Sequence, residues 1–474
     1  MENSTILLLM SAYFGLLMLV SWRMGKQSGN DAFFTANRKA PWYVVSIGMI
    51  GSSISGLSIV SVPGMVAGNS FLYMQTVFGF FVGYIILAKV LLPVYYKLES
   101  PSIYVYLLDR FGKNSYKTGA WFFLLSKSIG ASARVYVVVL VLHEFLLKEL
   151  GVSFPITAAL VILLIWLYTF RSGNKTIVWT DLLQTLFMIA ALILILLVFA
   201  KGLDLDGKGI WDTVRASDQS RIFEWHDWSS KQHFFKQFFS GIFIVLVMTG
   251  LDQEMIQKNK TIRRLDQAQR NMYWYGFMFI PINLLLLVTG VLMYHFANKN
   301  GLTLPDSPDS ILPVLITQHM GNAFAVLLLV VGIVSATFSG ADSSMTAITT
   351  SFCVDILEKE NNERIRRMVH ILVAILFVVF ILLFRALNSL TLIDAIYTIA
   401  SYTYGPLLGM FAFGLFTKRK TMDKRVPAIA LASPLLCYCI QWVAAGFGYH
   451  FGYELLMLNG LFTFTGLWIS SNRN

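Results

Sequence analysis

Three stretches of the chain place polar or charged side chains inside otherwise apolar sequence. In the stretch from 332 to 351, Ser339, Asp342 and Ser343 are spaced at i, i+3 and i+4, so their oxygens share one face of a helix. Carboxylate and hydroxyl oxygens without Cys or His suit a hard cation such as sodium. The alternative is a hydrogen-bonded polar seam between helices, which requires a partner for the aspartate.

The second stretch is rich in glycine and serine. It reads Gly51-Ser52-Ser53-Ile54-Ser55-Gly56-Leu57-Ser58 and is followed by Pro63 and Gly64. Such a helix tends to unwind, and carbonyl groups freed at membrane depth are tolerated where they line a cavity or bind an ion. Close helix packing through small residues is the alternative. We therefore predict a broken helix near residues 51–58.

The third feature is a set of isolated charges: Lys127, Arg134 and Asp181. Charges within membrane spans mark functional sites by default, although Asp181 could also cap a helix at the headgroup level. Because arginine stays protonated, we expect Arg134 to face an acidic partner, Asp181 or Asp342, or an anionic solute in a cavity, or else to snorkel to an interface. By contrast, the charges at 254–260 follow an apolar run, and we expect them to form an ordinary solvated helix end.

Nothing in the sequence forms a catalytic set. The seven histidines are scattered, and no nucleotide-binding glycine loop or catalytic triad motif is present. We therefore expect a protein that is not an enzyme. An ion channel or a membrane sensor remains the alternative class, although no filter loop or ring of charges is evident.

The elements that carry these residues follow from composition. Of 474 residues, 56% are hydrophobic and only 13% are charged, which indicates that lipid is the solvent. The predicted fold class is an all-α polytopic membrane protein, because each backbone group in lipid must be satisfied within its own segment. We predict about thirteen transmembrane helices, at 4–22, 42–66, 70–96, 118–147, 155–170, 176–200, 237–257, 273–296, 321–350, 368–386, 391–416, 426–446 and 452–471.

The basic residues orient these spans. With the N-terminus outside, most of the 37 Lys and Arg fall in alternate loops on the opposite side. This is the positive-inside bias, which accounts for the net charge of +11 without a nucleic-acid partner. We expect an integral protein of the cytoplasmic membrane, with its N-terminus outside and its C-terminus inside.

Several motifs resemble the sodium:solute symporter family over nearly the whole chain. They are residues 51–64, Trp179-Thr180-Asp181-Leu182-Leu183-Gln184-Thr185, Gly250-Leu251-Asp252-Gln253, residues 335–355 and Gly405-Pro406-Leu407-Leu408-Gly409. The resemblance implies sodium-coupled symport of a small solute by alternating access. It also implies a leucine-transporter-type fold: an extra N-terminal helix at 4–22, inverted five-helix repeats at 42–200 and 237–416, and two C-terminal helices at 426–471. A monomer is expected to suffice.

The resemblance also implies sodium sites. The common site would use the carbonyls of Gly51, Ile54 and Ala336 and the hydroxyl of Ser339, beside Gly340, where relatives usually have a hydroxyl. The second site, present in some members, would use the following residues: Asp181, Ser339, Asp342 and Ser343. Asp342 adds a carboxylate where relatives have Ser or Thr, so it could compensate for Gly340 or bind a proton.

The resemblance constrains the solute less. Phe279 and Val245 stand where sugar carriers have Lys and Asn, which disfavours a galactose-like solute. Arg134 falls near an arginine of carboxylate carriers, and its guanidinium suits a carboxylate. Its expected neighbours at the solute are Ser53, Ser55, Ser58, Gln75 and Thr76. We expect an anionic solute such as a sialic acid, a monocarboxylate or an amino acid, with a neutral sugar or polyol as the alternative.

Overall fold

A computed structural model describes residues 3–24, 29–148, 150–170, 173–228, 230–320, 323–387, 392–447, 449, 451 and 454–472. Its regular secondary structure, over these residues, is helical apart from a two-residue antiparallel pairing of β1 (Lys420–Thr421) with β2 (Ser471–Asn472). The predicted all-α class is confirmed.

Among the described residues, twelve α-helices precede residue 217. They are α1 (Asn3–Met24), α2 (Asn30–Thr35), α3 (Trp42–Ser53), α4 (Gly56–Gly64), α5 (Val66–Asn69), α6 (Tyr73–Ile86), α7 (Leu92–Lys97), α8 (Val105–Arg110), α9 (Lys113–Leu142), α10 (Phe154–Thr169), α11 (Asn174–Gly202) and α12 (Gly207–Ala216). A further nine are described after it. They are α13 (Phe234–Met248), α14 (Gln253–Lys260), α15 (Leu265–Lys299), α16 (Pro308–Val314), α17 (Ala323–Ser351), α18 (Glu363–Leu387), α19 (Leu392–Phe416), α20 (Val426–Gly446) and α21 (Glu454–Ile469).

Within the described residues, each of the thirteen predicted segments coincides with a helix, a run of helices or a bent pair of helices; residues 321–322, 391 and 452–453 of three segments lie outside the described residues. Among the described residues, 8 helices are long and apolar enough to cross a membrane, or up to 10 if each bent pair is one span. The figure of thirteen spans therefore stays a prediction. Apolar helices such as α10 and α21 are shorter than 18 residues, which is why length and composition alone do not include them.

The predicted break lies between α3 and α4, whose axes differ by 62°. Serine and glycine stabilise the break locally: Ser55 Oγ accepts a hydrogen bond from Ser58 N at 3.4 Å, and Gly56 N donates to Thr337 Oγ1 at 3.2 Å. Gly51 allows close approach to α11, because a Cβ there would lie 2.2 Å from Thr185 Oγ1. The small residues thus serve both the break and the packing.

A second break, which was not predicted from the sequence, lies between α13 and α14, whose axes differ by 68°. The side chain of Asp252 caps the N-terminus of α14, where its Oδ1 accepts a hydrogen bond from Glu254 N at 2.8 Å. The order of elements after the two breaks is alike, since each bent pair is followed by further long apolar helices.

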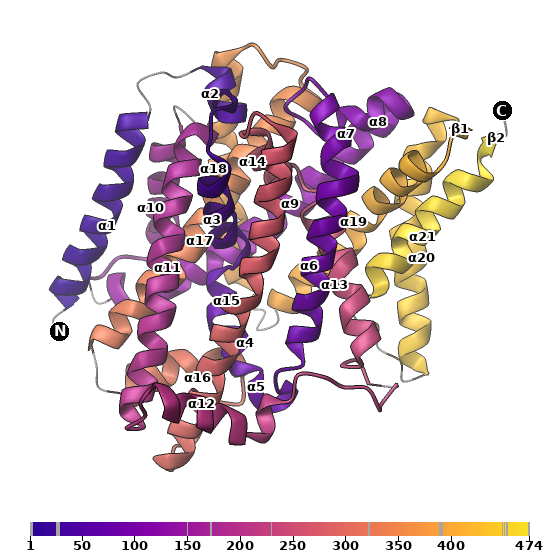
Figure 1. The fold of residues 1–474 in the computed structure, drawn as a ribbon. Helices are drawn as coiled ribbons and strands as arrows, with labels where there is room; N and C mark the ends of the chain where they lie inside the picture. The colour runs from indigo at the N-terminus through magenta and orange to yellow at the C-terminus, as the bar shows by residue number, and fades with distance from the viewer. Residues whose placement is uncertain are drawn as a thin grey trace.

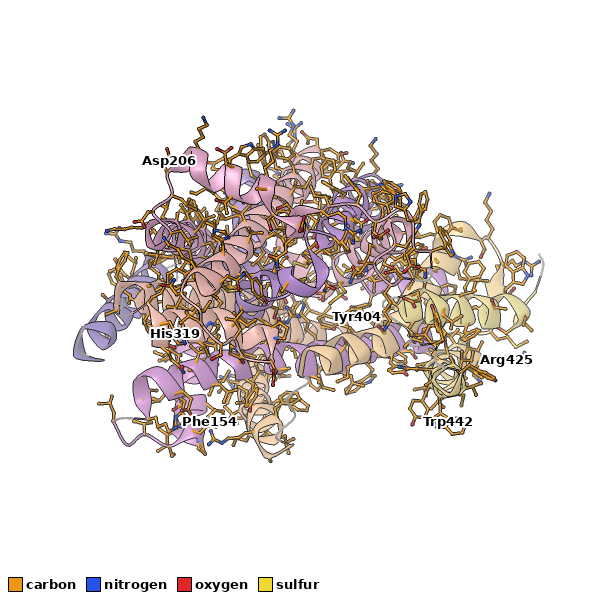
Figure 2. All side chains as sticks on the ribbon, turned by 90° about the horizontal axis from the view of Figure 1, so that it is seen from below. Phe154, Asp206, His319, Tyr404, Arg425 and Trp442 are labelled. Atoms are coloured by element: carbon orange, nitrogen blue, oxygen red, sulfur yellow. The ribbon has the colours of Figure 1, made fainter. Side chains whose placement is uncertain are left out.

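The bent helices lie in the middle of the bundle. In Figure 1, α3, α14 and α17 are central, with α1 on one side and α20 and α21 on the other. Helix α17 packs against α3, α9, α11 and α14. Seen along the bundle in Figure 2, Tyr404 of α19 lies near the middle, whereas Arg425 and Trp442 lie at one end. Polar residues on the central helices are therefore shielded from lipid.

Candidate functional site

A cavity lies between the two helix breaks. Its volume, measured as the space open to the centre of a water molecule, is about 180 Å³. Its wall combines hydroxyl and amide groups, charged groups and aromatic rings: Ser52, Ser53, Ser55, Ser58, Ser126, Lys127, Arg134, Thr249, Asp252 and Asn283 with Tyr73, Phe80, Tyr84, Phe279 and Tyr404 among others. An apolar wall with a few convergent polar groups is typical of a site for a small molecule.

Arg134 reaches this cavity from the middle of α9. Its Nε donates to Gly130 O of its own helix at 3.3 Å. Within the described residues, Arg134 forms no ion pair with a carboxylate, including those of Asp181 and Asp342. The guanidinium therefore retains donors that can face a solute.

The predicted solute residues separate into two groups. Ser53, Ser55 and Ser58 line the cavity, as do Val245 and Phe279, the positions used to disfavour a galactose-like solute. Gln75 and Thr76 are not among its lining residues. Gln75 instead binds the segment before α13: its Nε2 donates to Gln232 O at 2.9 Å and its Oε1 accepts from Glu224 N at 3.0 Å. Thr76 Oγ1 donates to Gln237 Oε1 at 2.5 Å.

We predict that Gln75→Leu lowers the free energy of unfolding by about 1–3 kcal/mol, because it leaves buried backbone groups of Glu224 and Gln232 without partners. Thermal unfolding in detergent measures the loss, and limited proteolysis should show faster cleavage within 221–233. The control is Gln267→Leu on α15, which should change neither. An increased KM for the solute at unchanged stability would instead place Gln75 at the solute.

The residues of the predicted common sodium site surround the first break. A small cavity, with about 10 Å³ for the centre of a water molecule, is lined by Ser52, Ala336 and Gly340 together with Ser55, Ala131, Arg134, Val135, Thr337, Ala341 and Ser344. Such a volume holds about one water-sized particle. A Cβ on Gly51 would lie 3.4 Å from Ser339 Oγ, so these two predicted ligands are close. Ile54, with an extended backbone, lines the larger cavity.

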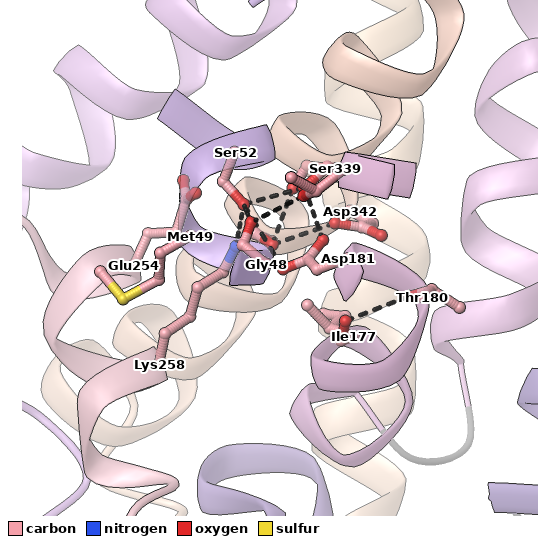
Figure 3. A network of polar contacts seen from close by, with 12 residues as sticks. Gly48, Met49, Ser52, Ile177, Thr180, Asp181, Glu254, Lys258, Ser339 and Asp342 are labelled. Atoms are coloured by element: carbon pink, nitrogen blue, oxygen red, sulfur yellow. Dashed lines mark hydrogen bonds and ion pairs between the residues drawn. The ribbon is translucent and has the colours of Figure 1, made fainter. Parts of the chain in front are cut away.

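The predicted second site contains a side chain that the sequence analysis did not include. Asp181 is buried and accepts a hydrogen bond from Ser339 Oγ at 2.7 Å, so two residues that the family resemblance assigned to one site are in contact. Its other carboxylate oxygen, however, lies 2.6 Å from Lys258 Nζ. Figure 3 shows the lysine reaching from α14 to Asp181 and Ser52. The expectation that residues 254–260 form a solvated helix end is wrong, because Lys258 is only 2% exposed.

Asp342 lies close to this cluster in Figure 3 but has different partners. Tyr168 OH donates to its Oδ2 at 2.9 Å and Ser343 Oγ donates to its Oδ1 at 3.0 Å. No described lysine or arginine lies within ion-pair distance of it. An ionised carboxylate in such a place is costly, so the group is suited to bind either a proton or a cation.

A second buried cluster lies at the edge of the cavity. Lys127 Nζ is 2.8 Å from Asp252 Oδ2 and 2.8 Å from Glu254 Oε2. Tyr404 OH donates to Asp252 Oδ2 at 2.7 Å and Ser344 Oγ donates to Glu254 Oε2 at 2.6 Å. One cation thus serves two acids at the second helix break.

The sequence contained a signal for these missed residues. Gly250-Leu251-Asp252-Gln253 stands at the start of the second predicted repeat, at the position where residues 51–58 stand in the first. Interrupted helices at corresponding positions of two repeats indicate a binding site. By that rule, Asp252, Glu254 and Lys258 are expected beside the cavity.

Comparison with known proteins agrees with this architecture. An outward-open, substrate-bound sodium-coupled sialic acid symporter superposes with a TM-score of 0.83 at 19% identity, over 100% of this chain and 99% of that one. A sodium/sialic acid symporter of Aliivibrio fischeri is 25% identical over 86% of this chain and 82% of its own length. The human sodium/iodide cotransporter is 25% identical over 85% of this chain, which spans 65% of that protein. A family model for the sodium:solute symporter family matches residues 33–424, and the chain therefore belongs to that family.

Proposed function

We propose that this symporter carries a small solute with a carboxylate or similar anionic group, together with sodium. The observation that carries the proposal is Arg134, whose guanidinium lines the central cavity without a described acidic partner. An arginine cannot lose its proton there, so an anionic solute would supply the missing charge. The forked guanidinium matches a carboxylate through two parallel hydrogen bonds.

The relatives support an anionic solute. By their names, those from Aliivibrio fischeri and Proteus mirabilis carry sialic acid, and a human relative that is 24% identical over 82% of this chain carries monocarboxylates. These solutes share a carboxylate and differ in size. The serines of the cavity, Ser53, Ser55 and Ser58, could bind hydroxyl groups of a larger solute or of a neutral polyol.

Sodium would bind at the first break, between the carbonyls of Gly51, Ile54 and Ala336 and the hydroxyl of Ser339. The helix break supports this proposal, because it frees carbonyl groups beside α17. Alternating access would proceed by movement of the proposed five-helix repeats, 42–200 and 237–416, about this site. We propose the N-terminus outside and the C-terminus inside, and a monomer as the transporting unit.

Uptake of labelled solutes into proteoliposomes tests the proposal. We expect a carboxylate from a panel of sialic acids, monocarboxylates and amino acids to accumulate with an inward sodium gradient, and not with an equal potassium gradient. A neutral sugar or polyol that accumulates better than every carboxylate would identify the alternative symporter. Sodium flux that occurs in the absence of solute, and whose rate does not saturate as any solute is added, would indicate a channel.

Ser339→Ala is expected to raise the sodium concentration for half-maximal uptake about 10-fold, because it removes a ligand oxygen whose interaction with a charged group is worth about 1.5–3 kcal/mol. Sodium titration of solute uptake measures the change. The matched control is Ser335→Ala, one turn earlier on the same buried helix, whose hydroxyl is not among the predicted sodium ligands. Equal sodium dependence of the two variants would remove Ser339 from the site.

A further inference from the structure

Lys258 closes a ring of buried polar groups around the predicted second sodium site. Its ammonium donates to Asp181 Oδ2 at 2.6 Å and to Ser52 Oγ. Ser339 Oγ donates to Asp181 Oδ1 at 2.7 Å and lies 2.9 Å from Ser52 Oγ. The four side chains are each at most 2% exposed, so water does not compete for these contacts.

The ring uses the acceptors that a sodium ion would need. Both carboxylate oxygens of Asp181 already have partners, one of them a full positive charge. Asp342 and Ser343, the other predicted ligands, bind each other and Tyr168 instead. A sodium ion at Asp181 would lie beside the ammonium and be repelled by it. The residues present therefore do not fit a sodium ion at this place.

We infer that the Lys258 ammonium is a built-in cation that replaces sodium at the Asp181 site. An ammonium has the charge of a sodium ion and binds the same hard oxygen acceptors, but it stays attached to α14. The solute is then accompanied by one sodium fewer than if the Asp181 site were open. Together with the proposed sodium-coupled function, on which this inference rests, it assigns sodium binding to the first break alone.

The ring leaves that common site intact. Ser339 donates its proton to Asp181, which leaves its oxygen able to accept. The hydrogen of the Ser339 hydroxyl thus points to Asp181 in the ring, and its oxygen can offer a lone pair to sodium at the first break. Ser339 is therefore shared between the built-in cation and the transported one.

Replacing the lysine tests the inference. In Lys258→Met, Asp181 becomes a buried carboxylate without a cation, and we expect a sodium ion to take the vacated place. The ratio of sodium-22 flux to solute flux should rise by one. In Lys258→Met/Asp181→Asn, which removes both charges, the ratio should return to that of the native protein.

Lys260→Met is the matched control. Lys260 is buried on the same helix, but its ammonium donates to the Ser100 carbonyl and to no described acid. This variant should keep the native ratio. A sodium ratio that stays native in Lys258→Met, or falls by one in Asp181→Asn alone, would overturn the inference, because sodium would then not be excluded by the lysine.

Thermal unfolding in detergent, without any solute, separates this inference from the proposed function. When sodium replaces choline in the buffer, the midpoint temperature of unfolding should rise more in Lys258→Met than in the native protein or in the double variant. An equal shift in all three would contradict the inference even if sodium-driven uptake is seen. If Lys258→Met does not fold, the neutral double variant should fold and keep the native ratio, and a lower ratio would overturn the inference.

Discussion

Lys127→Met is expected to lower the free energy of unfolding by about 3–5 kcal/mol, because it leaves two buried carboxylates without their shared cation. Asp252 and Glu254 each lie 2.8 Å from the Lys127 ammonium and are buried. Their remaining donors are the hydroxyls of Tyr404 and Ser344 and the backbone N–H of Glu254, none of which is charged. The decrease in the midpoint temperature of thermal unfolding in detergent measures the effect. We also expect little folded protein to reach the membrane.

A neutral cluster provides the matched comparison. Lys127→Met/Asp252→Asn/Glu254→Gln removes all three charges at nearly constant volume, and it should recover most of the lost stability, as buried ion pairs replaced by uncharged groups often do. The triple variant should still transport poorly if the cluster is part of the cavity wall. Equal stability of Lys127→Met and the native protein would mean that water reaches the two acids.

The bundle could be predicted from the sequence because its signals are local. Long apolar runs indicated the long helices, and the glycines and serines of 51–58 indicated the first break, since both depend on residues that are neighbours in the chain. The carboxylate and hydroxyl face of α17 was likewise visible in its spacing. What such signals cannot give is the partner of each group across the bundle.

Lys258 shows why the rest was missed. It follows an apolar run and stands among other charges, a pattern that usually marks a helix end in water. Its partner, Asp181, is 77 residues earlier in the chain, and the second bend is what turns α14 towards it. Hydropathy treats both charges as unfavourable to membrane burial, whereas together they form a pair that can be buried.

The same limit applied to Gln75. A polar residue inside an apolar span is a candidate for solute binding, but its amide groups bind backbone groups of the segment before α13. Only the position of that segment, which lies more than 140 residues later in sequence, distinguishes the two roles. Arg134 differs because no such partner approaches it in the described part of the chain.

Arg134→Ala is expected to weaken solute binding about 10- to 100-fold, since hydrogen bonds to a charged group contribute about 1.5–3 kcal/mol. Arg134→Lys should recover little of this affinity, because a lysine keeps the charge but lacks the planar fork that binds both carboxylate oxygens. Solute binding at saturating sodium, measured by calorimetry on purified protein, reports the loss directly.

The control is Arg385→Met on α18, whose guanidinium lies 4.0 Å from the centre of the Phe154 ring and does not line the cavity. It should leave solute affinity unchanged.

Sodium binding distinguishes the role of Arg134 further, because Arg134 lines both the solute cavity and the small cavity at the first break. Its positive charge disfavours a sodium ion there until an anionic solute neutralises it. In the native protein the solute should therefore increase sodium affinity, and sodium should increase solute affinity by the same factor.

In Arg134→Ala the repulsion is gone, so sodium should bind without solute at least as tightly as in the native protein. The mutual enhancement of sodium and solute affinity should therefore shrink. Native-like enhancement in Arg134→Ala would show that the guanidinium does not connect the two cavities, and that the anionic group binds elsewhere.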